Sequence, residues 1–137
     1  MSISGQCLCG AVRYQASEGP ITTRVCWCRL CQYIGAGSGT VNSIFLRAAI
    51  HVTGALQDYP CLAESGTHMH RQFCGICGTH LFAYAEERPT LLVVRVGSLD
   101  DRESVKPASS IWISAAPSWS CIDLSLPQVA GQPPPVV

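Results

Sequence analysis

Hydrophobic and polar residues alternate over short stretches of this chain, which is the pattern of strands buried on one face. In the first clear stretch Val12, Tyr14 and Ala16 fall on one side, whereas Arg13 and Gln15 fall on the other. Further strands are predicted at residues 21–25, 41–46, 50–53, 56–59, 67–73, 80–85, 91–96 and 110–114. Turn signals separate them, and no amphipathic helix longer than two turns is predicted. The sequence therefore predicts an all-β domain of short strands.

Length and composition predict one domain with a short tail. A chain of 137 residues has the size of one domain and buries enough surface for a core. Its last residues are rich in proline, glycine and glutamine. We therefore expect a domain over residues 1–126 and a poorly ordered tail over residues 127–137.

The charge balance argues against two classes of partner. Nine basic and nine acidic residues cancel, and a neutral chain lacks the positive surface that binds phosphate backbones. No apolar stretch approaches the roughly 18 residues expected of a membrane span. The sequence predicts a small-molecule partner rather than nucleic acid or a membrane, and it leaves the oligomeric state undetermined.

The chain has nine cysteines, and its first residues carry neither the basic start nor the apolar run of an export signal. We therefore expect a cytoplasmic protein. In a reducing compartment, closely spaced cysteines indicate metal ligation before disulfides, and an odd number cannot all pair.

One pair of cysteine motifs predicts a structural metal site. Cys74 and Cys77 are separated by two residues and followed by Gly78, a spacing that lets one tight turn direct two thiolates at one metal. Near the start, Cys7 and Cys9 are alternate residues, which point to the same face of an extended strand. Together the four predict a closed zinc site, and the alternative is a set of buried reduced thiols.

A second cysteine group is denser. Cys26, Cys28 and Cys31 fall within six residues and predict a zinc with three thiolate ligands and an open fourth position, as in catalytic sites. Such a zinc is a weak Lewis acid toward a carbonyl, but a fourth thiol would bind as a nucleophilic thiolate. The alternatives are an empty or an oxidised loop. The glycine-rich residues 33–40 either cradle an anionic group or bend closely past this loop.

Taken in order, the motifs C-x-C-G-x-V-x-Y, C-x-C-x-x-C and F-C-x-x-C-G-T-x-L resemble those of the glutathione-dependent formaldehyde-activating enzyme family, also named for centromere protein V. The resemblance covers residues 4–120 and implies a zinc-stabilised β-tent fold. It implies a structural zinc on Cys7, Cys9, Cys74 and Cys77 and a second zinc on Cys26, Cys28 and Cys31. It also implies reversible formation of S-hydroxymethylglutathione from formaldehyde and glutathione, a carbon–sulfur lyase reaction.

The chain departs from this family at positions that bear on the formaldehyde reaction more than on the metals. Trp27 and Gln32 stand where histidine and arginine are usual. Ser110 stands where histidine often precedes an Ile-Trp pair.

Other residues with reactive or charged side chains lie outside these motifs. Cys61 and Cys121 are expected to be small buried hydrophobic residues, although Cys61, in a predicted loop, is a candidate fourth ligand. His68 and His70 face one way on a predicted strand, where a partly exposed structural role is the commoner one. The cations available for the carboxylates of glutathione are Arg13, Arg24, Arg29 and Arg71.

We therefore predict a zinc-dependent carbon–sulfur lyase that acts on an adduct of glutathione, or a similar thiol, with formaldehyde or another small aldehyde. A second hypothesis is a non-enzymatic zinc-stabilised β scaffold that binds a protein partner. A third is a redox-sensing loop whose oxidation expels the second metal. An open second site favours the enzyme, whereas a closed second site or a single metal favours the scaffold.

Overall fold

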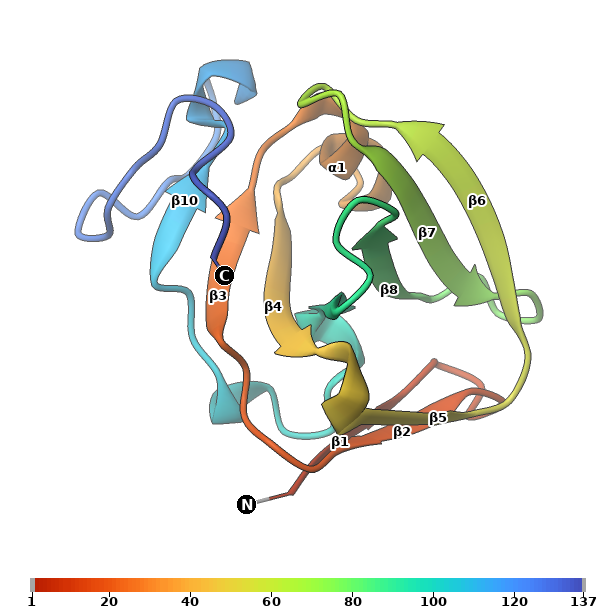
Figure 1. Cartoon of the computed structure of the whole chain (residues 1–137). Helices are drawn as coiled ribbons and strands as arrows, with labels where there is room; N and C mark the ends of the chain where they lie inside the picture. The colour runs from red at the N-terminus through yellow and green to blue at the C-terminus, as the bar shows by residue number, and fades with distance from the viewer. Residues whose placement is uncertain (1, 137) are drawn as a thin grey trace.

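The computed structural model describes residues 2–136 and consists mainly of strands (Figure 1). Its strands are β1 (Ile3–Gln6), β2 (Arg13–Ala16), β3 (Thr22–Cys26), β4 (Thr40–Leu46), β5 (Ile50–Thr53), β6 (Leu56–Leu62), β7 (His68–Cys74), β8 (His80–Ala85), β9 (Leu91–Arg95) and β10 (Ser109–Ile111). Helical elements are α1 (Arg29–Ile34) and the 3-10 turns η1 (Arg47–Ala49), η2 (Val96–Ser98), η3 (Arg102–Ser104) and η4 (Ile113–Ala115). The all-β prediction is confirmed.

The strands form two sheets. The larger has the order β10-β3-β4-β9-β8-β7-β6 and is antiparallel except for the parallel pair of β10 and β3. The smaller has the order β1-β2-β5 and lies below the curved larger sheet in Figure 1. The chain passes from β5 to β6 at Gly54, which has a φ of +103° and no room for a Cβ beside the carbonyl oxygen of Ala11.

The main core fills the space between the two sheets. Its fully buried side chains include Val12 from the smaller sheet side and Phe45, Leu81, Phe82 and Val94 from the larger sheet side. The ring of Tyr14 packs edge-on against Phe82, with centroids 5.0 Å apart. Burial raises the pKa of Tyr14 to about 12, and its hydroxyl lies 2.6 Å from that of Ser98. Cys7 and Cys74 are also buried in this core.

The segment expected to be a poorly ordered tail instead follows the edge strand β10. The amide of Ser110 donates to the carbonyl oxygen of Pro127, and the amide of Val129 donates to that of Ser110, both at 2.9 Å. Proline has no amide proton, but its carbonyl still accepts a hydrogen bond, so its abundance does not exclude pairing. The chain bends at Ala130 and Gly131, and residues 132–136 have no regular secondary structure. Met1 of the predicted domain and Val137 of the predicted tail lie outside the described residues.

Two local predictions also differ from the structure. Cys7 and Cys9 lie in the turn after β1 rather than on an extended strand, and this turn is closed by Gly10, whose φ is +80°. The loop predicted to carry Cys26, Cys28 and Cys31 contains the short helix α1.

No helix within residues 2–136 is long and apolar enough to cross a membrane.

Candidate metal centres and pocket

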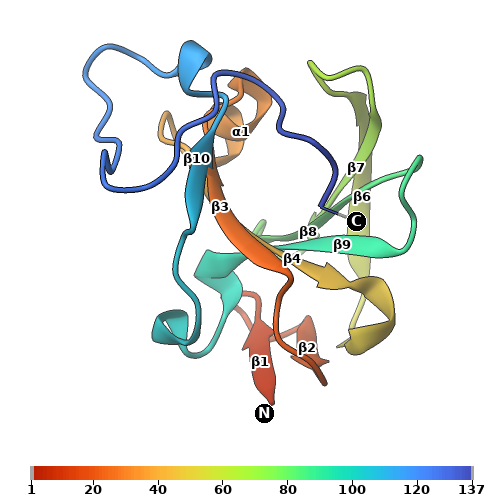
Figure 2. The ribbon, with the colours of Figure 1, turned by 60° about the vertical axis from the view of Figure 1, so that its left-hand side comes forward.

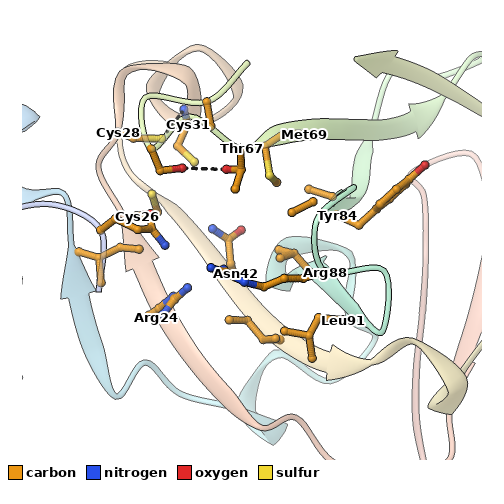
Figure 3. A pocket seen from close by; sticks show the side chains of 18 of the residues that line it. Arg24, Cys26, Cys28, Cys31, Asn42, Thr67, Met69, Tyr84, Arg88 and Leu91 are labelled. Carbon is orange, nitrogen blue, oxygen red and sulfur yellow. Dashed lines mark hydrogen bonds between the residues drawn. The ribbon is translucent and has the colours of Figure 1, made fainter. Parts of the chain in front are cut away.

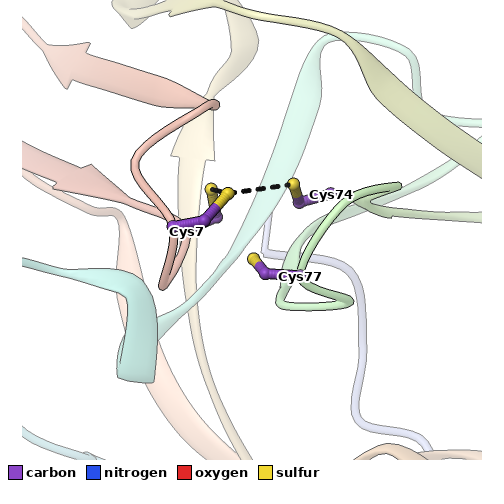
Figure 4. Close-up of side chains that lie close together, drawn as sticks. Cys7, Cys74 and Cys77 are labelled. Carbon is purple, nitrogen blue, oxygen red and sulfur yellow. Dashed lines mark hydrogen bonds between the residues drawn. The ribbon is translucent and has the colours of Figure 1, made fainter.

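Four cysteine sulfurs from both sheets converge at the first candidate metal centre (Figure 4). The Sγ atoms of Cys7, Cys9, Cys74 and Cys77 all lie within 4.8 Å of one another. Cys9 Sγ is 3.6 Å from that of Cys7 and 3.8 Å from that of Cys74. A tetrahedral zinc with metal–sulfur bonds of about 2.3 Å requires sulfur–sulfur separations of about 3.8 Å. The four side chains therefore fit a structural zinc.

Short turns aim these sulfurs at one point. In the turn between β7 and β8, the amide of Gly78 donates to the carbonyl oxygen of Cys74 at 2.8 Å, and Gly78 has a φ of +76°. The amide of Ile76 donates to Cys74 Sγ at 3.4 Å. Hydrogen bonds from the side chain and the backbone of Thr79 lower the pKa of Cys77 to about 5. Such contacts stabilise thiolates, which are the form that binds metal.

The second candidate centre is formed by Cys26, Cys28 and Cys31, whose sulfurs also lie within 4.8 Å of one another. Cys26 ends β3, Cys28 is the N-cap of α1, and Cys31 lies in the first turn of that helix. The Sγ of Cys28 accepts a hydrogen bond from the amide of Cys31 at 3.4 Å. A helix of six residues is thus the element that brings three thiols from one loop to a single point.

The side chains of Gln32 and Trp27 fix this loop from behind. Gln32 is buried, and its Nε2 donates to the carbonyl oxygens of Trp27 at 2.8 Å and Ala115 at 2.9 Å. The ring of Trp27 packs against Gly39, where an added Cβ would lie 3.0 Å from the indole. The glycine-rich segment therefore bends closely past the metal loop, and Trp27 packs behind the loop rather than lining the pocket in front of it.

No fourth protein ligand joins this centre among residues 2–136. Cys61, the candidate for that position, lies on β6, and its Sγ is 2.6 Å from Nη1 of Arg71. Pro60 is tolerated in β6 because β6 is an edge strand.

Cys121 is exposed, so its predicted burial is wrong.

The three sulfurs open onto a cavity of about 260 Å³ (Figure 3). Its walls come from the larger sheet, the turn between β6 and β7, and the C-terminal segment. Four arginines line it: Arg24, Arg71, Arg88 and Arg95. Among the described residues, the one carboxylate on the wall belongs to Glu64, whose Oε1 accepts a hydrogen bond from the amide of Arg29. Figure 3 shows Arg24 below Cys26, from the same strand β3, and Arg88 on the other side of Asn42. The pocket is therefore positively charged.

Two of these arginines are buried without a carboxylate partner. Arg71 and Arg95 are each 7% exposed, and no arginine or lysine has a carboxylate oxygen within 4.0 Å in the part of the chain that the structure describes. Nη1 of Arg95 donates to Asn42 Oδ1 at 2.7 Å, but the buried Nε atoms of both arginines have no hydrogen-bond acceptor. An unpaired buried cation is costly, so these groups favour an anion in the pocket.

The charge of Arg95 also acts on the cysteine group. Hydrogen bonds from Cys26 and Cys28 lower the pKa of Cys31, and the positive charge of Arg95 lowers it further. The hydrogen bond with Cys28 is the main cause that raises the pKa of Cys26. The positive charge of Arg95 therefore favours the thiolate form of Cys31.

Comparison with known proteins agrees with this arrangement of cysteines. A profile of the glutathione-dependent formaldehyde-activating enzyme family matches residues 2–115. The chain belongs to this family. The matched residues include both candidate metal centres and all four pocket arginines.

Two individual proteins resemble this family member. A Halomonas elongata protein, whose name marks it as a candidate glutathione-dependent formaldehyde-activating enzyme, is 26% identical over 108 residues, which are 73% of this chain and 67% of that protein. The crystal structure of a Rhodobacter sphaeroides protein matches with a TM-score of 0.58 and 24% identity, over 76% of this chain and 96% of that chain. The second likeness shows the fold alone.

Some residues proposed from the sequence do not line the pocket beside the three cysteines. Four arginines were candidates for binding the carboxylates of glutathione, and two of them, Arg24 and Arg71, line the pocket. The other two lie outside it: Arg13 donates to the carbonyl oxygen of Gly10, and Arg29 lies over the ring of Tyr33. His68 and His70 bind carboxylates of Glu87, Asp58 and Glu86.

Arg88, Arg95 and Asn42 were missed by the sequence analysis. The available signal for Arg95 was its charge, which falls near the end of the apolar strand predicted at residues 91–96.

Proposed function

We propose that this member of the glutathione-dependent formaldehyde-activating enzyme family is a zinc-dependent carbon–sulfur lyase. Its substrate would be the adduct of glutathione, or a similar acidic thiol, with a small aldehyde such as formaldehyde. The observation that carries the proposal is the position of the three-cysteine group, which faces a pocket lined by four arginines and has no fourth protein ligand among the described residues.

Cys26, Cys28 and Cys31 would hold the catalytic zinc, and Cys7, Cys9, Cys74 and Cys77 the structural one. The catalytic zinc would supply a Lewis acid that ionises a thiol well below the usual pKa of about 8.5. The donor set supports this assignment, because thiolate sulfur is a preferred ligand of zinc and three protein ligands leave a position for substrate.

The arginines would bind and orient the thiol. Glutathione carries two carboxylates, and guanidinium groups bind carboxylates through paired hydrogen bonds. Anchoring these carboxylates in a pocket closed at one end by cysteines directs the sulfur of the ligand toward that end. Arg95 lies beside Cys31, so its charge stabilises negative charge where the thiol ionises.

The bond changes are balanced without a further reactant. In the forward direction the sulfur forms a bond to the carbonyl carbon, the carbonyl π pair moves to oxygen, and the thiol proton ends on that oxygen. In the reverse direction the carbon–sulfur bond breaks, and thiol and aldehyde are regenerated.

Metal content and thiol binding test the proposal together. Protein prepared without chelator should contain two zinc ions per chain, and after cobalt substitution glutathione should change the absorption spectrum of one of them. Exchange between formaldehyde, glutathione and their adduct, followed by NMR, should be faster with the protein than without it. The exposed Cys121→Ser variant is the matched control, because it removes a thiol outside both groups. One zinc per chain that does not respond to thiols would overturn the lyase proposal and favour the scaffold hypothesis.

A further inference from the structure

The C-terminal segment 132–136 is part of the pocket, although it lies beyond the residues that match the family. The family profile ends at residue 115. Four later residues, Gln132, Pro134, Pro135 and Val136, line the same cavity as the three cysteines. Figure 2 shows this segment crossing from β10 toward the side of the larger sheet that holds β9. One wall of the pocket therefore lies outside the residues that the family profile matches.

Directional contacts fix the start of the segment against Trp112. The indole Nε1 of Trp112 donates to Gln132 Oε1 at 2.9 Å, and the backbone amide of Trp112 donates to the carbonyl oxygen of Gly131 at 3.3 Å. Trp112 has a left-handed backbone, with a φ of +56°, which is rare for a bulky residue. Residues held in such conformations are maintained by surrounding contacts and are common at ligand sites.

An apolar surface runs from the cysteines to this segment. Ile111 is buried with Cys26 and Cys31, and Trp112 packs against the same cluster. The pocket wall continues with Pro134, Pro135 and Val136, which carry no charge and no side-chain hydrogen-bonding group. The arginines supply binding sites for carboxylates, but they do not account for an apolar wall beside the sulfur end of the pocket.

We propose that this wall binds an organic group carried on the sulfur of the substrate. The preferred substrate of this chain is then a thiol adduct whose transferred group is apolar and larger than one carbon. This inference rests on the proposed function, since it assumes that a glutathione-like thiol places its sulfur at the three cysteines. It adds the class of aldehyde, which the family name does not give for this chain.

S-alkyl glutathiones test the wall by binding alone. Isothermal titration calorimetry of the zinc-loaded protein with S-methyl-, S-propyl- and S-butylglutathione should give an affinity that rises about two- to fourfold for each added methylene. The triple variant P134S/P135S/V136S should reduce this dependence to less than about 1.5-fold for each methylene, with the affinity for glutathione itself unchanged. The control is P133S, because Pro133 belongs to the same segment but does not line the pocket. Zinc content should stay at two per chain in both variants.

The outcomes separate this inference from the proposed function. An affinity that does not rise with alkyl length in the unmodified protein, or a dependence that is the same in the triple variant as in P133S, overturns the inference alone. Failure of glutathione itself to bind the zinc-loaded protein overturns both. A Gln132→Ala variant, which removes the hydrogen bond to Trp112 and part of the Gln132 side chain from the pocket wall but leaves Pro134, Pro135 and Val136 in place, should give an intermediate dependence on length.

Discussion

Cys9 and Cys74 lie with their sulfur atoms 3.8 Å apart, although 65 positions separate them in the chain. Cys9 belongs to the turn that follows β1 of the smaller sheet, and Cys74 ends β7 of the larger sheet. A metal bound by the two residues would therefore connect the sheets at a point where Cys7 and Cys74 are already part of the core.

Loss of one ligand at this centre should destabilise the whole fold. Structural zinc contributes on the order of 10 kcal/mol to folding, so the Cys74→Ser variant should lose the first zinc and unfold well below the temperature of the unmodified protein. Circular dichroism during heating and zinc content per chain measure the two effects. The same unfolding temperature in Cys74→Ser and in the control Cys121→Ser would contradict the structural role.

Loss of one ligand at the second centre should leave the fold intact. In Cys28→Ser the serine still accepts the N-cap hydrogen bond from the amide of residue 31, since serine is a preferred N-cap residue. We expect one zinc per chain instead of two, a nearly unchanged unfolding temperature, and no spectral response of the cobalt form to glutathione. Two zinc ions in this variant would mean that Cys28 is not a ligand.

The pocket arginines should determine the affinity for an acidic thiol. Hydrogen bonds to charged groups contribute about 1.5–3 kcal/mol, so Arg24→Gln should weaken the binding of glutathione about tenfold or more. Arg13→Gln is the matched control, because Arg13 hydrogen-bonds Gly10 and lies outside the pocket. Calorimetry with glutathione measures both variants, and equal affinities would show that the carboxylates of the thiol bind elsewhere.

Gln32 should stabilise the metal loop through the two carbonyl oxygens that it binds. Gln32→Leu has a similar size but leaves the buried carbonyl oxygen of Trp27 and the partly buried one of Ala115 without this donor, and a buried unsatisfied group costs about 1–3 kcal/mol. We expect a lower free energy of unfolding in denaturant and weaker retention of the second zinc under chelator. The exposed Gln15→Leu on β2 provides the comparison, and equal stability of the two variants would rule out this role.

His70 should make stability depend on pH. Its Nδ1 lies 2.7 Å from Asp58 Oδ2 and its Nε2 lies 2.7 Å from Glu86 Oε1, and only the protonated ring donates through both nitrogens. These two bonds raise the pKa of His70 above its ordinary value of 6.5. Because the pKa is raised on folding, the stabilisation is complete below about pH 6.5 and is lost as the pH rises through the raised pKa.

Denaturant unfolding at a series of pH values measures this loss. His70→Gln should flatten the decline above pH 6.5, whereas the exposed His51→Gln should retain it. His68 binds Glu87 at 2.7 Å and acts in the same direction, so the double variant should be the flattest. An identical decline in His70→Gln and His51→Gln would exclude His70 as its source.

Much of the fold was predictable because its signals are local. Alternation marked strands such as β2 and β7, and the thiolate spacing at Cys74 and Cys77 identified the turn between β7 and β8. The extended backbone predicted for Cys7 and Cys9 was wrong, because these residues lie in a turn closed by Gly10. Their sulfurs nevertheless point to the same place, as predicted. The helix α1 was missed because six residues are too few to show a helical period.

The composition of the pocket was much less predictable, because it depends on pairings between distant segments. Arg95 reaches Asn42 only because β9 pairs with β4 in the register that sets these two residues opposite each other. Nothing in the sequence distinguishes Arg13 from Arg24 as a candidate cation. Arg24 lines the pocket because it lies on β3 of the larger sheet, whereas Arg13 lies on β2 of the smaller sheet. The C-terminal segment was misjudged because proline content says nothing about the free amides of the neighbouring strand β10 that its carbonyls pair with.

The distance along the chain between Cys9 and Cys74 also sets an order of events during synthesis. At about 5–20 residues per second, a ribosome takes about 3 to 13 s to extend the chain by the 65 positions from Cys9 to Cys74. Cys26, Cys28 and Cys31 are all synthesised long before Cys74. On the emerging chain, the cysteines of the second candidate centre are therefore all present before the first candidate centre, which joins the two sheets, can be completed.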